Sequence, residues 1–179
     1  AIGYGFPADA AEAPETLVMV HRVAIGWLSL LLCGALFQFV PVLVAKPLRR
    51  PSLVLPVLGC LAAGLGLLLL GFLQLAGAFE SGFPFLLVGG CLLLSGFGLA
   101  IWVLAETLWQ ARPLPLPARF VAVGLGCLVG LALLGSLFTH LLSGFVSADG
   151  LAANRDRLVA IHATLGIGGW VCFSAISVS

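Results

Sequence analysis

Residues 19–44 read MVHRVAIGWLSLLLCGALFQFVPVLV, and this stretch decides the fold. Beyond Arg22 the run carries no charge, and it is longer than the roughly 20 helical residues needed to cross the hydrocarbon of a bilayer. His21 stands at its entrance. A similar arrangement returns at residues 161–178, IHATLGIGGWVCFSAISV, where His162 precedes several glycines and a tryptophan. Imidazole groups at the start of two apolar spans are therefore the main chemical signal of the sequence.

The overall composition indicates an integral membrane protein. Of the 179 residues, 61% are hydrophobic and only 8% are charged, whereas a soluble domain has roughly 25% charged residues. The net charge of +1 gives no sign of nucleic-acid binding. The five cysteines lie inside hydrophobic runs without CxxC or metal-ligand spacing, so we interpret them as small apolar residues.

The hydropathy pattern predicts an all-α, polytopic membrane bundle of five transmembrane helices. Each span must be a helix because every backbone polar group in lipid needs an internal partner, and no alternating pattern typical of a β-barrel is present. We expect an N-terminal segment at 1–16 and a membrane domain at 17–179 that ends as if truncated. Within that domain the expected helices are 17–45, 52–79, 81–110, 118–147 and 158–179. Gly126 and Gly130 form a GxxxG motif, which predicts close packing against another helix.

The charges between the spans predict the orientation. The loops on one side carry five basic residues and no acid: Lys46, Arg49, Arg50, Arg112 and Arg119. The opposite side is richer in acids, with Glu80 in one loop and three acids in the N-terminal segment. By the positive-inside rule the N-terminal segment lies outside, and both His21 and His162 enter from the outer face. We expect the protein to reside in the bacterial inner membrane.

Ionisable residues inside the spans are candidates for function. Glu106 either extends to the inner interface beside Arg112 or marks the mouth of a proton path. His140, near the outer end of the fourth predicted helix, is either an interfacial residue or part of the same site as the other two histidines. His21 and His162 are either interfacial polar residues or metal ligands, because neutral imidazole suits haem iron and copper.

Two segments carry a family resemblance. HRVAIGW…GALFQFVPVL, residues 21–43, resembles the second transmembrane helix of subunit I of the haem-copper oxidases, with matching residues at His21, Gly34, Ala35 and Pro41. Residues 161–179 resemble the sixth helix of the same fold, and the two histidine-bearing helices are four helices apart, as the repeated four-helix arcs of that family require. The resemblance implies that His21 is a haem ligand and that His162 is a metal ligand, in true oxidases for copper.

The sequence also departs from that family. True oxidases of one major class place a tyrosine one turn after the sixth-helix histidine, whereas here Ala163, Thr164, Leu165 and Gly166 follow His162. The histidines of the later helices would lie beyond Ser179, so we do not expect a complete oxygen-reducing centre in this chain.

Two functions from different classes follow. The first is a membrane haem-binding protein in electron transfer or in the binding of O₂ or NO. The second is a cofactor-free structural or accessory subunit of a larger membrane complex. The expected partners are the lipid bilayer and other membrane helices or subunits. A transporter is a weaker third hypothesis, because no paired charges lie in the middle of the spans.

Overall fold

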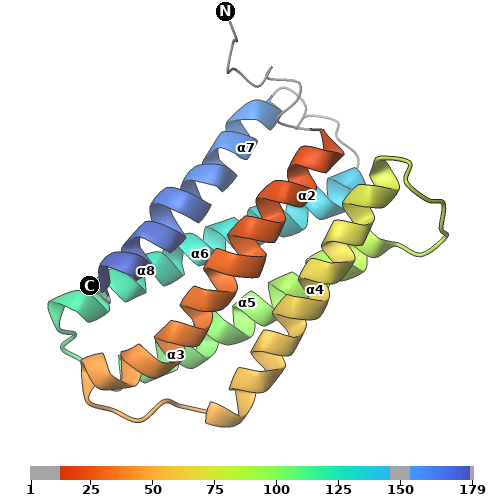
Figure 1. Ribbon diagram of the computed structural model, residues 1–179. Coiled ribbons are helices and arrows are strands. Elements are labelled where there is room, and N and C mark those ends of the chain that lie inside the picture. The colour runs from red at the N-terminus through yellow and green to blue at the C-terminus, as the bar shows by residue number, and fades with distance from the viewer. Residues whose placement is uncertain (1–12, 146–153, 178–179) are drawn as a thin grey trace, which may run out of the picture.

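The computed structural model describes residues 13–145 and 154–177, and all of its regular structure is helical (Figure 1). Five helical spans are long and apolar enough to cross a membrane. The fold predicted from the sequence is thereby confirmed, and the architecture is that of an integral membrane protein. The first span comprises α2 (Pro14–Val23), the π-helix η1 (Ala24–Ser29) and α3 (Leu30–Val44).

The remaining four spans follow in order along the chain. The second consists of the 3₁₀ turn η2 (Pro51–Leu53) and α4 (Val54–Leu75), the third is α5 (Phe85–Trp109), and the fourth is α6 (Leu116–Leu142). The fifth comprises α7 (Arg155–Thr164), the π-helix η4 (Leu165–Val171) and α8 (Cys172–Ser177). The expected features at 1–12, 146–153 and 178–179 lie outside the described residues.

Local backbone chemistry places the helix ends. The second span ends at Leu75, four residues earlier than expected, because the turn that follows uses Gly77 at φ 76°, a left-handed conformation that glycine adopts without steric cost. The third span begins at Phe85 rather than at residue 81. Pro84 caps it, and a residue that precedes proline is disfavoured in helical conformation.

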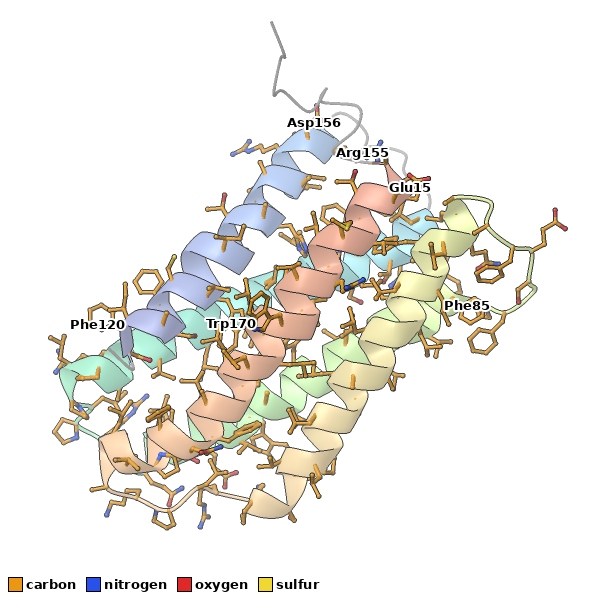
Figure 2. The ribbon with its side chains drawn as sticks, in the orientation of Figure 1. Glu15, Phe85, Phe120, Arg155, Asp156 and Trp170 are labelled. Atoms are coloured by element: carbon orange, nitrogen blue, oxygen red, sulfur yellow. The ribbon has the colours of Figure 1, made fainter. Side chains whose placement is uncertain are left out.

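The first span packs across the other four, and each of these lies beside its neighbour in sequence (Figure 1). Glu15, Arg155 and Asp156 lie together at one end of the bundle (Figure 2). The basic connections between α3 and α4 and between α5 and α6 lie at the other end. The separation of charge that the sequence predicts is therefore present in the fold.

A ladder of leucine and glycine pairs joins α4 to α5. Gly64 faces Leu93, and a side chain at Gly89 would come within 2.7 Å of the backbone nitrogen of Leu68. The same alternation continues at both ends, where Leu61 packs on Gly96 and Leu86 on Gly71. Both helices carry the pattern LxxGxxxLxxG, at residues 61–71 and 86–96. Antiparallel packing sets each leucine of one helix against a glycine of the other, which lets the backbones approach closely.

A similar set of pairs fastens the fifth span to α6. Cβ atoms built at Gly124 and Gly130 would meet Ser174 and Leu165, respectively, and one built at Gly169 would meet Cys127. Gly126, the other half of the expected GxxxG motif, faces open space. Only Gly130 of that motif therefore contributes a close approach between helices.

The orientation can be tested by thiol labelling. With the native cysteines replaced by alanine, we expect Ser81→Cys to react with a membrane-impermeant maleimide added outside intact cells. Ser52→Cys, in η2 directly after the basic connection, should react only after permeabilisation. Both positions are exposed. Ser52 precedes α4 and Ser81 follows it, so the two positions lie at opposite ends of the bundle and each serves as the control for the other. Labelling of Ser52→Cys in intact cells would contradict the predicted orientation.

Candidate functional site

The first and fifth spans bring two histidines together toward the end of the bundle that carries Glu15 and Arg155. The ring centroids of His21 on α2 and His162 on α7 are 6.5 Å apart, and the ring planes are inclined by 29°. Both side chains are half-buried. The sequence predicts that both enter from the same face, and the fold adds that they are lateral neighbours although 141 positions separate them.

Each histidine stands three residues before a π-helical segment. His21 precedes η1, which begins at Ala24, and His162 precedes η4, which begins at Leu165. π-Helical turns are rare insertions in α-helices and occur frequently at functional sites. The extra residue in each turn rotates the helix below the histidine relative to the helix above it. The first and fifth spans thus share the same local arrangement, a histidine followed three residues later by a π-helical segment.

Aromatic rings and a glycine surround the pair. The ring of Phe72, from α4, lies 5.1 Å from that of His21, and the ring of Phe138, from α6, lies 5.5 Å from that of His162. A Cβ atom at Gly135 would come within 3.3 Å of Cε1 of His162, so glycine leaves the space that this imidazole occupies. Four of the five spans therefore contribute to the site.

The hydrogen bonds of the two rings differ. Nδ1 of His21 lies 2.9 Å from the carbonyl oxygen of Leu17. Because a carbonyl only accepts, Nδ1 carries the proton and Nε2 retains its lone pair in the neutral ring. Nδ1 of His162 is buried and has no hydrogen-bond partner among residues 13–145 and 154–177. One ring is thus oriented by the carbonyl of Leu17, whereas the other lies near the backbone of Leu131 and its Nδ1 forms no hydrogen bond within the described chain.

A second bridge joins the same two spans further into the bundle. Nε1 of Trp170 donates to Oγ of Ser29 at 3.1 Å, and this hydroxyl donates to the carbonyl oxygen of Ala24 at 2.8 Å. Trp170 is fully buried between the fifth span and the first (Figure 2). Since both partners lie in π-helical segments, this contact fixes the relative depth of the two histidine-bearing spans.

The other two candidate residues lie apart from the pair. Nδ1 of His140 bonds the carbonyl oxygen of Ser136 at 2.7 Å, and its ring packs on Phe145 rather than on either of the other histidines. Glu106 lies at the opposite end, where its carboxylate accepts from Nε of Arg50 at 2.8 Å. Nε of Arg49 lies 3.5 Å from the same carboxylate. Glu106 was expected beside Arg112, but the connection after the first span supplies its partners instead.

The sequence did not indicate the residues that surround the histidines. Phe72, Phe138 and Gly135 are ordinary members of apolar spans, and only the packing of α4 and α6 brings them to the site. Ser29 and Trp170 share the 141-residue interval of the histidines. A search for polar residues at this interval would have found them.

Few side chains that could coordinate a metal lie near one another. Within the described ranges, no three or more His, Cys, Asp or Glu side chains gather as a metal-binding group would require. Comparisons with protein-family models, with curated proteins and with solved structures find no match to this chain. A functional assignment therefore depends on the histidine pair and its surroundings.

Proposed function

We propose that this chain is a membrane haem-binding protein in which His21 and His162 supply imidazole to haem iron, for electron transfer or for the binding of O₂ or NO. The observation that carries the proposal is the 6.5 Å between the two ring centroids. The rings are stacked at 29°, so on binding haem both would turn their unprotonated nitrogens toward the iron. The short separation would let the two imidazoles share one metal.

The number of ligands favours haem over a bare ion. A tetrahedral zinc or copper site needs three or four side chains, and the described residues offer two at this position. Haem iron takes four nitrogens from its macrocycle and needs at most two from the protein. The same count argues against a separate copper site at His162 within the described chain.

The protein's contribution is to orient the imidazoles and to exclude water. The bond from His21 to the carbonyl oxygen of Leu17 fixes the ring and leaves Nε2 as the ligand, the arrangement that most metal-binding histidines adopt. The partnerless nitrogen of His162 is a second candidate ligand. Phe72 and Phe138 cover the rings with apolar surface. Haem bound by both imidazoles would supply one-electron redox chemistry, and haem bound by one of them would bind a small gas.

The proposal is tested by an absorbance titration of the purified protein with hemin. We expect the wild-type chain to develop a Soret band of low-spin, histidine-bound haem. His21→Ala should weaken haem binding at least about 100-fold, since loss of an outer partner of a ligand already costs about 10–100-fold. His162→Ala should either weaken binding similarly or convert the spectrum to that of five-coordinate iron.

His140→Ala is the matched control. This histidine lies near the same end of the bundle but outside the pair, so its replacement should leave the Soret band unchanged. A protein that stays colourless with hemin, or whose band is the same in His21→Ala and wild type, would exclude the haem role. Stoichiometric co-purification of a colourless chain with other membrane subunits would favour the accessory-subunit hypothesis.

A further inference from the structure

An apolar groove runs between α5 and α6 on the lipid-facing surface of the bundle. Its volume is about 270 Å³, and it reaches from Trp109 and Arg112 at the basic end to Ile101 and Val129 deeper in the span. Gly126 lies in the groove and faces open space, so the absent side chain contributes to the hollow. The groove is separate from the histidine pair, which lies near the opposite end of the spans.

The mouth of the groove is cationic and aromatic. The guanidinium of Arg112 lies 3.6 Å from the centre of the Trp109 ring, and Nε of Arg119 donates to the carbonyl oxygen of Leu114, which also lines the groove. The only carboxylate between Glu80 and Asp149 in the sequence is Glu106, and Arg49 and Arg50 engage it. Two cationic groups thus gather at the groove mouth while the nearest carboxylate is paired elsewhere.

We propose that this groove binds one anionic phospholipid, with an acyl chain along α5 and α6 and the phosphate at Arg112 and Arg119. Ala122 and Val129 are seven residues apart, so the groove penetrates about 10 Å into the apolar layer. Small and apolar side chains line the groove over that length, among them Ala105, Ala122 and Gly126. This lining suits a hydrocarbon chain.

The charge of this end of the bundle specifies the kind of lipid. The loops here carry five basic residues and no acid, and basic pockets on the cytoplasmic side of helix bundles bind anionic head groups. Trp109 is 65% exposed at the mouth of the groove. Tryptophan favours the head-group level, because its ring is apolar and its N–H is polar. The groove therefore combines a slot for a chain with a site for a phosphate at the depth where a phospholipid has both.

The experiment is a fluorescence-quenching titration of the full chain in phosphatidylcholine vesicles. Phosphatidylglycerol with brominated acyl chains is added, and the signal of Trp109 is obtained as the difference from Trp109→Phe. We expect brominated phosphatidylglycerol to quench Trp109 at much lower lipid fractions than brominated phosphatidylcholine. Arg112→Gln should weaken the preference about fivefold, which corresponds to ~1 kcal/mol per basic residue near an anionic surface.

Two glycine variants separate a bound lipid from a docked helix. Gly126→Leu should fill the groove and abolish the selective quenching, whereas Gly66→Leu, at an exposed glycine of α4 that also faces open space, should behave as wild type. Equal quenching by the two lipids, or wild-type quenching in Gly126→Leu, would overturn the proposal. A change in oligomeric mass in Gly126→Leu without any change in lipid quenching would assign the groove to a helix of a second copy.

Discussion

Replacing Gly89 with leucine is expected to lower the free energy of unfolding by about 3 kcal/mol, the upper end of the usual cost of overpacking. A Cβ atom at this position would lie 2.7 Å from the backbone nitrogen of Leu68 and 3.0 Å from the carbonyl oxygen of Gly64. These are backbone atoms of α4, so no rotamer change can relieve the clash. The helices must separate, and the packing of the whole ladder weakens. Unfolding in mixed detergent micelles, followed by circular dichroism, measures the change.

Gly98→Leu is the control for this experiment. Gly98 lies on the same helix, and a side chain there would meet nothing within 4 Å. Both substitutions remove a helical glycine and add the same apolar group, so helix propensity and hydrophobicity cancel in the comparison. We expect Gly98→Leu to be neutral or slightly stabilising, because leucine is the better helix former. Equal stability of the two variants would show that α4 and α5 do not approach as closely as the structure indicates.

This ladder shows how much of the fold the sequence could predict. The five spans followed from hydropathy, since the cost of unpaired backbone groups in lipid leaves few alternatives. The contact between α4 and α5 was also encoded, in the two LxxGxxxLxxG patterns at 61–71 and 86–96. The GxxxG motif at Gly126 and Gly130 predicted a close contact between helices, but Gly126 faces the groove on the lipid-facing surface. A short motif identifies small residues, and only complementary patterns on two helices identify a partner.

The sequence predicted how deep the candidate site lies in the membrane but not which helices form it. Loop charges placed His21 and His162 at the same face, which the fold bears out. Their lateral proximity depends on the first span lying beside the fifth, and no hydropathy signal encodes which helices are neighbours. The π-helical segments that follow the two histidines could not be predicted either, because their sequences, AIGWLS and LGIGGWV, look like any other apolar helix. Depth follows from the bilayer, whereas the contact between the first and fifth spans depends on side-chain packing, which hydropathy does not encode.

The partners of Glu106 give a second example of the same limit. Arg112 is near in sequence, but α5 ends at Trp109 and Arg112 turns back onto that ring. The carboxylate instead pairs with Arg50, from a connection more than fifty residues away in sequence. A side chain at a helix end is free to select the nearest cation in space, so the partner depends on which loop passes that end.

Replacing Trp170 with alanine is expected to cost about 4 kcal/mol of stability, within the usual range for truncating a buried tryptophan. Trp170 has the largest fully buried side chain of the described residues. It fills the space between the first and fifth spans where both are π-helical, and a cavity there removes packing on two helices at once. Thermal unfolding in a mild detergent, with circular dichroism as the readout, gives the difference from wild type.

A double-mutant cycle separates packing from hydrogen bonding at this position. Trp170→Phe retains most of the ring volume but removes the donor to Ser29, and Ser29→Ala removes the acceptor. Hydrogen bonds between membrane helices contribute about 0.6 kcal/mol on average, so we expect a coupling energy of that size. The larger part of the Trp170→Ala effect should come from lost packing. A coupling near zero together with a small Trp170→Ala effect would mean that the two spans are not fastened at this depth. The spacing of His21 and His162 would then need another structural cause.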